Sequence, residues 1–480
     1  SRLFLFAILN FQRSTLNSQR SIFDFQLFLL PLYQQKSRNM DAKQLYALYQ
    51  QHPKVTTDSR NCPEGSIFIA LKGASFNGNK FAKAALEKGC SYAIVDEAEY
   101  AEAGNNRFIL VDNALVAYKE LAREHRRNID IPVIGITGTN GKTTSKELIS
   151  AVLAEKYKVH HTLGNFNNDI GVPRTLLEMT SDDEIAVIEM GASHPKDIEK
   201  LVTYVEPTCG LITNVGRAHL QGFGSFEGVK NTKGELYDYL KAHNALLFLN
   251  ESNPDLVEMA EQREFERVIT YGQDNTADVK GEVVSCAPLL KFSWQATQSL
   301  GTEQVVSAVY EVQSNLIGAY NLDNMLAAIT ICLHFGVEPQ KICHALESYV
   351  PSNNRSQLTE TKDNKLIVDA YNANPSSMKA AIENFRLMDI KNKMAILGDM
   401  RELGDVTAEE HQRVVDELIA SGLENVWLVG EEFGKTNCSF RKFADIEEVK
   451  AAIAAQKPID HYILIKGSNG IKLFELPELL

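Results

Sequence analysis

A glycine-rich run at residues 135–144, GITGTNGKTT, has the composition of a loop that binds phosphate. The apolar stretch 131–136 that overlaps its start predicts a strand, and the apolar residues that follow it recur at helical spacing. Strand, glycine-rich turn, Lys-Thr and helix together are the context that a phosphate-binding loop requires. Backbone N–H groups and the helix N-terminus would surround the phosphates of a nucleotide. Lys142 would reach the β- and γ-phosphates, and the Thr143 hydroxyl would ligate Mg²⁺.

The run departs from the common G-x-x-x-x-G-K-T form, because position 136 is Ile and the earlier glycines are 135 and 138. An ordinary glycine-rich turn is the alternative, and the flanking strand and helix argue against it. The sequence contains no N-K-x-D motif for guanine, so we expect ATP. The residues expected to contact the nucleotide are Gly138, Thr139, Asn140, Gly141, Lys142, Thr143 and Thr144.

Three further polar residues could serve the same site. Glu189 ends the apolar strand 185–189, and an acid at the carboxyl end of a parallel strand points into the crevice where such sheets bind ligands. It could hold Mg²⁺, although a solvent-facing carboxylate is an equally good interpretation. His219 follows the apolar strand 210–212 and could complete a second metal site, against a purely structural role. Asn324 could bond a base edge, with helix capping by Asn321 as the competing interpretation.

The elements that must position these residues form three segments of α/β texture. A chain of 480 residues is too long for one ordinary core. Residues 40–128 predict a small N-terminal α/β domain. Residues 129–349 alternate strands and helices, which predicts a central ATP-binding domain with a mostly parallel sheet. Residues 350–480 alternate again and predict a second open α/β domain at the C-terminus, with a hinge at 351–354.

Composition limits the partners. The formal net charge of -13 argues against nucleic acid or an anionic membrane surface. The seven cysteines form no C-x-x-C pair, which indicates reduced thiols in the cytoplasm rather than a disulfide framework or a zinc site.

Residues 1–39 differ from the rest, because they carry five basic residues against the single acid Asp24. We expect a non-native or disordered extension, with the natural start at Met40. A membrane-anchoring leader is the weaker alternative, since neither apolar run, 3–9 or 27–32, is long enough to span a bilayer.

Several motifs together resemble the Mur ligase family, the ATP-dependent amide-forming enzymes of peptidoglycan precursor synthesis. They are GTNGKT at 138–143, EMGA at 189–192, AHL at 218–220, and Tyr320-Asn321 with Asn324. The resemblance covers residues 40–480. Four further motifs are similar to the member that adds D-Ala-D-Ala to UDP-MurNAc-tripeptide. They are DAYNANPSSM at 369–378, GDMRELG at 398–404, GNFNN at 164–168 with GVP at 171–173, and TDSR at 57–60 with FIALKG at 68–73.

This resemblance implies three domains: an N-terminal UDP-substrate-binding domain at 40–128, a central ATP-binding domain at 129–349 and a C-terminal Rossmann-like domain at 350–480. It also implies the cofactors ATP and Mg²⁺. We expect a monomer that inserts into no membrane. It implies that ATP phosphorylates the tripeptide carboxylate and that the dipeptide amine then displaces phosphate. Lys142, Glu189 and His219 would serve phosphate and metal, joined by Lys233 if that lysine is carbamylated. Arg355 would reach the γ-phosphate, and Asp369 the ribose. The residues implied for the two other substrates are Ser59, Arg60, Lys72, Asn165, Asn167, Asn372, Asn374, Lys466 and Ser468.

The sequence departs from the family at Asn469, where Arg is usual, at Arg174, where an apolar residue is usual, and at Lys196, where Gly is common. Other Mur-type or folylpolyglutamate-like ligases are the alternatives within the class, and the 369–378 motif argues against both. A P-loop ATPase that works as a conformational switch is the alternative from another class. A further alternative is an inactive protein that acts as a binding scaffold. The evidence against it is that the chemical residues are intact: Lys142, Thr143, Glu189 and His219.

Overall fold

The computed structural model describes residues 40–300, 303–351 and 357–480. The segment 1–39, Arg355 and most of the predicted hinge at 351–354 lie outside these ranges. The chain divides into two compact units, Ser1–Asn128 and Ile129–Leu480. The predicted split of the second unit into domains 129–349 and 350–480 stays a prediction, and we call these parts the central and C-terminal modules.

The first unit is built on a parallel sheet with the strand order β1-β2-β3-β4. Its strands are β1 (Val55–Thr56), β2 (Ile67–Ile69), β3 (Tyr92–Val95) and β4 (Phe108–Leu110). Its helices are α2 (Ala42–Gln51), α3 (Ala82–Glu87) and α4 (Ala114–Asn128), with short 3₁₀ turns at Gly78–Phe81 and Ala98–Tyr100. Small alanines of α3 and β3 let helix and sheet approach closely around Phe68, which makes one compact core.

The central module contains a large sheet with the order β13-β12-β11-β10-β9-β8-β5-β7-β6, and β14 also pairs with β12. The strands from β6 to β11 run parallel. They are β5 (Val133–Thr137), β6 (Val159–His161), β7 (Ile185–Glu189), β8 (Cys209–Ile212), β9 (Leu246–Asn250), β10 (Val268–Gly272) and β11 (Val279–Cys286). Strands β5, β7, β8 and β9 are buried along their whole length, which is why they appear in the sequence as continuous apolar runs.

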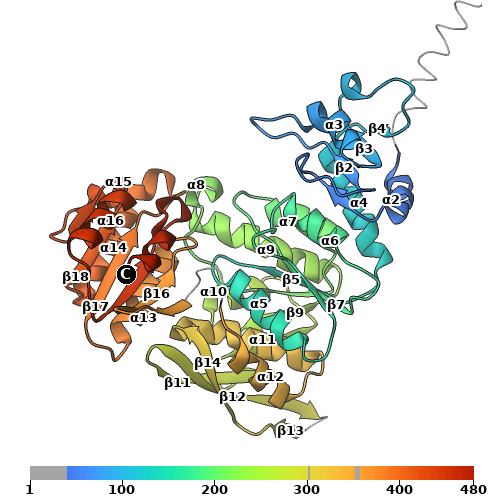
Figure 1. Cartoon of the computed structure of the whole chain (residues 1–480). Coiled ribbons are helices and arrows are strands. Elements are labelled where there is room, and N and C mark those ends of the chain that lie inside the picture. The colour runs from blue at the N-terminus through green and yellow to red at the C-terminus, as the bar shows by residue number, and fades with distance from the viewer. Residues whose placement is uncertain (1–39, 301–302, 352–356) are drawn as a thin grey trace, which may run out of the picture. The chain divides into compact units, whose positions relative to one another are not determined.

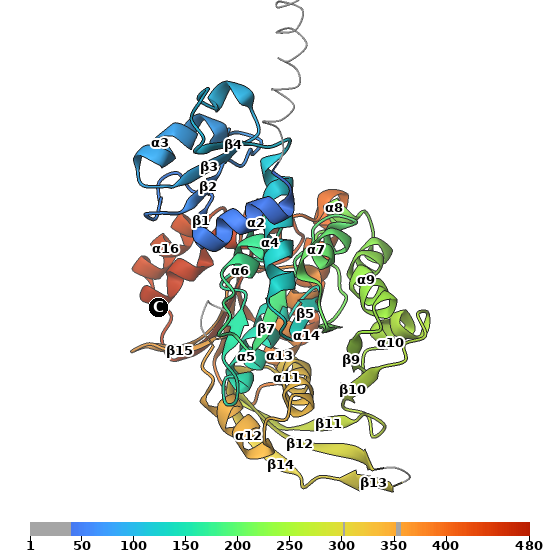
Figure 2. The ribbon, with the colours of Figure 1, turned by 90° about the vertical axis from the view of Figure 1, so that its right-hand side faces the viewer.

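Strands β12 (Leu289–Leu300), β13 (Glu303–Val306) and β14 (Tyr310–Ile317) extend this sheet in antiparallel fashion. Figure 2 shows β11 to β14 together at the lower end of the molecule. We did not expect this extension. Its strands follow one another as hairpins, in which Cys286 pairs with Leu290 and Leu300 with Glu303, and the sequence has no Asn-Gly or Asp-Gly turn signal there.

Helices cover both faces of the central sheet: α5 (Lys142–Leu153), α6 (Gly171–Leu177), α7 (Asp197–Val205), α8 (Leu220–Phe223), α9 (Phe226–Ala242), α10 (Pro254–Glu261), α11 (Leu322–His334) and α12 (Pro339–Ser348). Helices α5 and α11 lie side by side (Figure 1), and their buried apolar residues join one core with the sheet. The helix that begins at the phosphate loop is therefore anchored along its length.

The C-terminal module has the strand order β15-β16-β20-β17-β18-β19, parallel except for β15. Its strands are β15 (Gln357–Glu360), β16 (Asn364–Asp369), β17 (Lys393–Gly398), β18 (Asn425–Val429), β19 (Arg441–Phe443) and β20 (His461–Lys466). Its helices are α13 (Pro375–Leu387), α14 (Thr407–Ser421), α15 (Glu431–Gly434) and α16 (Ile446–Ala455). Short 3₁₀ turns occur in this module at Gly404–Val406, Asn469–Ile471 and Leu473–Glu478, and another precedes α11 in the central module at Ala319–Asn321. The predicted α/β class with mostly parallel sheets is confirmed.

No helix in the described ranges combines the length and the apolarity that crossing a membrane would need.

Lys196 begins helix α7 in the left-handed region, with φ of 68°. Its backbone N–H donates to Glu235 Oε1 (2.8 Å), and the N–H of Glu199 donates to Glu235 Oε2 (2.8 Å), so one carboxylate closes the N-terminus of the helix. A left-handed residue with a Cβ is strained, which explains why glycine suits this position.

We therefore predict that Lys196→Gly stabilises the protein by about 0.5–1 kcal/mol, because the strain disappears while the backbone bond to Glu235 remains. Thermal unfolding of the variant would show a higher midpoint. Lys200→Gly, in the regular part of the same helix, is the matched control and should lower the midpoint. An equal effect of both changes would contradict the role of the left-handed conformation.

Candidate active site

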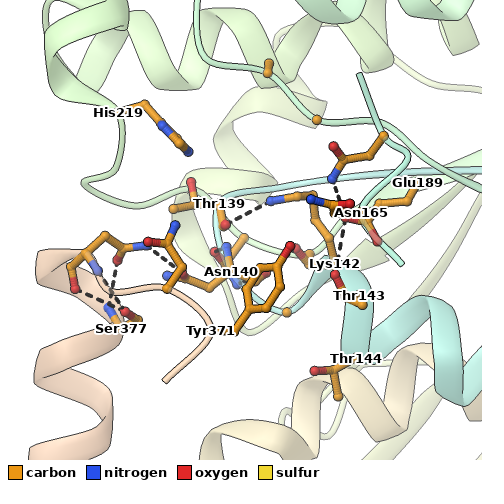
Figure 3. A pocket seen from close by; sticks show the side chains of 18 of the residues that line it. Thr139, Asn140, Lys142, Thr143, Thr144, Asn165, Glu189, His219, Tyr371 and Ser377 are labelled. Carbon is orange, nitrogen blue, oxygen red and sulfur yellow. Dashed lines mark hydrogen bonds between the residues drawn. The ribbon is translucent and has the colours of Figure 1, made fainter. Parts of the chain in front are cut away.

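A cavity of about 650 Å³ lies where loops at the carboxyl ends of the central parallel strands face the C-terminal module. Most of the residues predicted from the sequence line it (Figure 3). Those are Thr139, Asn140, Gly141, Lys142, Thr143, Thr144, Asn165, Asn167, Glu189, His219, Asn324, Asp369, Asn372, Asn374 and Lys466. Gly138, Lys233 and Ser468 are close in sequence or structure to this set but do not line the cavity.

The phosphate loop needs its two inner glycines for both conformation and space. Gly138 has φ of 145° and Gly141 has φ of 79°, values that side chains rarely allow. A Cβ on Gly138 would lie 2.0 Å from Thr213 Oγ1, and one on Gly141 would lie 2.5 Å from Asn324 Oδ1. The loop is thus held tightly between strand β8 and helix α11.

Asn214, directly after β8, braces the loop through three hydrogen bonds. Its carbonyl accepts from Thr139 N (2.9 Å), its Oδ1 accepts from Asn140 N (3.0 Å), and its Nδ2 donates to Asn140 O (3.0 Å). We did not single out Asn214 for this role from the sequence. The signal that could have identified it is its position after the strand that pairs with β5.

Helix α5 starts at the loop, and no side chain caps its N-terminus. The helix dipole and the first N–H groups therefore make this end favourable for an anion. Lys142 Nζ lies at the loop and donates to the carbonyls of Gly138 (2.7 Å) and Thr139 (3.0 Å). Loop, helix end and ammonium together form a site for a polyphosphate.

Glu189 is only 1% exposed at the end of β7, and its carboxylate is held in place on one side. Oε1 accepts from Asn167 Nδ2 (2.7 Å) and from Thr143 Oγ1 (3.3 Å). Oε2 is buried and has no hydrogen-bond partner among the described residues. A buried carboxylate oxygen without a partner calls for a cation, so the donor set of Glu189 and Thr143 fits Mg²⁺. The described ranges contain no cluster of three or more His, Cys, Asp or Glu residues, so phosphate and water oxygens would complete the shell.

His219 lines the same cavity but on the other side from Glu189 and Thr143, as Figure 3 shows. Its Nδ1 faces Oε2 of Glu402, from the C-terminal module, as a close contact rather than an aligned hydrogen bond. Burial lowers the pKa of His219, the Lys142 and Lys233 charges lower it further, and Glu402 opposes them. A neutral imidazole is thereby favoured, which is the form that binds metals.

Lys233, in helix α9, is 2% exposed, and its Nζ lies 5.4 Å from the centre of the Phe223 ring. Burial lowers the pKa of Lys233 well below its ordinary value, and the charge of Lys142 adds to this effect. A buried lysine with a lowered pKa is an available neutral amine. That is the form that carbamylation needs, and the modification itself stays a prediction.

Asn324 lies in the first turn of α11, beside the phosphate loop. Its Nδ2 donates to Asn321 Oδ1 (2.8 Å), and its Oδ1 accepts from Ser145 Oγ (3.0 Å). The Asn321 side chain forms no capping bond and instead donates to Ile317 O (2.8 Å). The capping alternative for Asn321 is therefore wrong, because its amide is used to hold Asn324 and the preceding strand.

The C-terminal module contributes charge to the cavity at the ends of β16 and β20. Lys466 Nζ, almost completely buried, donates to Asp369 Oδ2 (2.5 Å) and to Asn372 O (3.3 Å). The Asn372 side chain accepts from the next backbone N–H, that of Ala373 (2.9 Å). Figure 3 shows Tyr371, which we did not predict, projecting toward the phosphate loop.

In addition to the contact of His219 with Glu402, hydrogen bonds join the two modules around this cavity. Asn374 Nδ2 donates to Asn140 Oδ1 of the phosphate loop (2.8 Å), while Asn374 Oδ1 caps helix α13. Arg217 N donates to Ser376 Oγ (2.9 Å). Arg217 Nη1 donates to the buried Glu410 Oε1 (2.7 Å), so the segment that carries His219 is tied to α14.

The remaining predicted residues have other surroundings. Asn165 is exposed at the cavity, whereas Ser468 is buried, and its Oγ accepts from Arg401 N (3.1 Å). In the first unit, Arg60 pairs with Asp58 (2.9 Å) and holds the pKa of that carboxyl down to about 2.

Also in that unit, the carbonyl of Ser59 accepts from Lys88 Nζ (2.7 Å), and Lys72 pairs with Asp96 (3.1 Å).

Three family descriptions match the chain: "Mur ligase family, catalytic domain" at 54–135, "Mur ligase middle domain" at 136–332, and "Mur ligase, glutamate ligase domain" at 354–469. The UDP-N-acetylmuramoyl-tripeptide–D-alanyl-D-alanine ligase of Bacillus subtilis is 33% identical, over 88% of this chain and 92% of that protein.

Solved structures agree with this relationship. MurF from Acinetobacter baumannii has a TM-score of 0.78 at 27% identity, over 90% of this chain and 98% of that one. The MurF ligase from Thermotoga maritima in complex with ADP has a TM-score of 0.77 at 27% identity, over 89% and 97%.

Fold and site define an ATP-dependent, ADP-forming ligase whose phosphate loop and C-terminal module face one cavity. The chain belongs to the Mur ligase family.

We predict that Lys233→Met raises the stability of the protein by about 1–3 kcal/mol while it lowers the turnover of ATP. A methionine of similar shape removes a buried amine that pairs with no carboxylate in the described residues. Chemical unfolding and a phosphate-release assay measure the two effects. Lys241→Met, at the exposed end of the same helix, is the control and should change neither quantity much. A destabilised Lys233→Met protein would contradict this account.

We also predict that Glu402→Gln lowers the pKa of His219 further, because it removes a negative charge that raises this pKa. The ¹³C-labelled imidazole resonance of His219, followed by NMR against pH in the nucleotide-free protein, gives this pKa. Glu409→Gln, which removes an exposed carboxylate paired with Arg413, serves as the control. An unchanged or raised His219 pKa in Glu402→Gln would show that the two side chains do not meet in solution.

Proposed function

We infer that this protein joins D-alanyl-D-alanine to UDP-N-acetylmuramoyl-tripeptide with hydrolysis of ATP to ADP and phosphate. The product is the UDP-N-acetylmuramoyl-pentapeptide of peptidoglycan synthesis. The observation that carries this proposal is the near full-length similarity to a ligase named for these two substrates. The cavity supports it, because a phosphate loop, a carboxylate suited to a metal and the C-terminal module all face it.

The proposed reaction has two steps. The terminal carboxylate of the tripeptide attacks the γ-phosphorus of ATP, which forms an acyl phosphate and releases ADP. The amine of the dipeptide then attacks the acyl carbon, phosphate leaves with the C–O bonding electrons, and the amine loses a proton. Each step requires a neutralised phosphate and the exclusion of water, which would otherwise hydrolyse the acyl phosphate.

We assign the following roles within this proposal. Lys142 and the N-terminus of α5 hold the β- and γ-phosphates. Thr143 and Glu189 hold Mg²⁺, which when bound neutralises phosphate charge. His219 and a carbamylated Lys233 would serve a second ion, and Arg355 would reach the γ-phosphate.

Further residues would position the substrates. Asn324 and Asp369 would lie at the nucleoside. Asn165 and Asn167 would lie near the tripeptide, and Asn372, Asn374, Lys466 and Ser468 on the acceptor side.

The first unit, residues 40–128, would hold the UDP group through Ser59, Arg60 and Lys72. The exposed guanidinium of Arg60 is suited to a diphosphate, although it would first have to leave Asp58. We propose that the protein works in the cytoplasm, where ATP and reduced thiols occur together. We propose that it works as a monomer.

Phosphate release by residues 40–480 with ATP and Mg²⁺ tests the proposal. It would be measured with UDP-MurNAc-tripeptide, with D-Ala-D-Ala, with both and with neither, together with mass spectrometry of the product. We expect release and a new pentapeptide only with both substrates. Lys142→Ala should lower the rate by about 100-fold or more, since it removes charge that the transition state needs. Release that is independent of both substrates would instead indicate an ATPase module.

A further inference from the structure

Lys146 is a completely buried lysine near the start of α5, and the site described so far gives it no role. Its side chain is 0% exposed, and it does not line the cavity. A buried ammonium group is unfavourable unless it is paired and hydrogen-bonded. A packed apolar side chain would serve a position that contributed to stability alone, so the partners of Lys146 indicate what the lysine is for.

The ammonium of Lys146 has one partner toward the surface and one inside the protein. Nζ pairs with Glu147 Oε1 (2.8 Å) and donates to the main-chain carbonyl of Thr162 (2.6 Å). The Glu147 side chain is 27% exposed, so an ion pair with it does not require a buried lysine. Thr162 is completely buried, so only the bond to its carbonyl requires the ammonium to lie inside.

Thr162 directly follows β6 and is bonded to the neighbouring strand β7 at two points. Its N–H donates to Val187 O (3.1 Å), and its Oγ1 accepts from the N–H of Glu189 (3.0 Å). With Lys146 on its carbonyl, the N–H, the carbonyl and the hydroxyl of Thr162 are all bonded. The strand end that carries Glu189 is therefore tied to α5 through this one threonine.

The loop that begins at Thr162 also holds the carboxylate of Glu189. It carries Asn167, whose Nδ2 donates to Glu189 Oε1 (2.7 Å) and whose carbonyl accepts from Gly191 N (2.7 Å). A Cβ on Gly191 would lie 2.8 Å from Asn167 Oδ1, so the amide fits closely against the main chain. A shift of this loop would therefore turn the carboxylate, and with it the oxygen Oε2 that has no partner among the described residues.

Helix α5 also carries Thr143, the other residue that fits Mg²⁺. Its Oγ1 donates to Glu189 Oε1 (3.3 Å). Lys146 lies three residues further along, and residues at this spacing share one face of a helix. One helix thus places Thr143 directly and, through Lys146 and Thr162, the carboxylate that must lie beside it. Groups that orient a metal ligand affect the affinity for the metal without touching it.

We propose that Lys146 is a positioning residue for Mg²⁺: its bond to the carbonyl of Thr162 fixes Glu189 in the orientation that presents Oε2 to the ion. The inference rests on the proposed function, in which Thr143 and Glu189 hold Mg²⁺. Lys146 contacts neither the ion nor the nucleotide in this account. Its loss therefore weakens the contribution of the metal and leaves the phosphate loop able to bind nucleotide by itself.

Calorimetric titration of the full chain with a non-hydrolysable ATP analogue, once with Mg²⁺ and once with EDTA, tests this assignment. In the unaltered protein we expect Mg²⁺ to tighten binding of the analogue. Lys146→Met keeps the approximate shape of the side chain and removes the donor. It should lower the affinity measured with Mg²⁺ by about 10-fold and leave the affinity measured with EDTA unchanged. A higher Mg²⁺ concentration should restore the lost affinity.

Two further variants test the route through Thr162 and keep the proposal testable if Lys146→Met does not fold. Thr162→Val removes the hydroxyl that accepts from Glu189 N and should cause the same Mg²⁺-specific loss while Lys146 is intact. Lys146→Arg retains a cationic donor and should recover part of the affinity that Lys146→Met loses.

Lys156→Met is the matched control. Lys156 Nζ also donates to main-chain carbonyls, those of Phe335 (3.0 Å) and Gly336 (2.9 Å), but it lies beyond the other end of α5. This change should alter neither titration. Glu147→Gln removes the ion pair of Lys146 and leaves its bond to Thr162, so it should also leave both affinities unchanged.

Equal losses with Mg²⁺ and with EDTA in Lys146→Met and Thr162→Val would overturn the proposal in favour of a purely structural role. Unchanged affinities in both variants would overturn it too. A Mg²⁺-specific loss in Glu189→Gln with none in Lys146→Met would be a failure of the Lys146 assignment alone.

Failure of the proposed function has a different result. If Mg²⁺ did not tighten binding in the unaltered protein, the assignment of the metal to Thr143 and Glu189 would be wrong, and the role of Lys146 with it. Absence of the pentapeptide product would contradict the proposed substrates and not the role of Lys146, because the titrations use neither the tripeptide nor the dipeptide.

Discussion

The repulsion between two anions, a carboxylate and a triphosphate, is the constraint on which the rest of this structure depends. Both must approach within bonding distance in a cavity that excludes water. The fold meets this need by placing positive potential at one point, where the N-terminus of α5 and Lys142 lie together at the phosphate loop. Gly138 and Gly141 allow the phosphate loop to close there, since no side chain would fit at either position.

Concentrating cations in a buried place has a cost. Lys142 lowers the pKa of both His219 and Lys233, in addition to the effect of burial on each of them. Glu189 is a buried acid rather than a buried base, and one of its carboxylate oxygens has no hydrogen-bond partner in the described residues. A packed apolar side chain in place of any of these groups would make the folded protein more stable. Function therefore accounts for them better than stability does.

The cavity exists only because two modules meet. Asn374 contacts the phosphate loop, Arg217 contacts Glu410, and His219 faces Glu402. The motif at 398–404 takes part in this meeting of the modules, since Glu402 faces the histidine of the cavity and its backbone carbonyl accepts from Gln221 N (3.3 Å).

The sequence by itself determined the α/β class, the phosphate loop with its strand and helix, and Glu189 at a strand end. The apolar residues of helix α14 (Thr407–Ser421) also recur at helical spacing in the sequence. These features depend on periodicity and backbone sterics, which act between neighbours in the chain. Tertiary structure alone decided the bracing by Asn214 and the placement of His219 beside Glu402 rather than Glu189. It also decided that Lys196 takes the left-handed conformation. Such contacts join residues far apart in the chain, and no local pattern carries information about a distant partner.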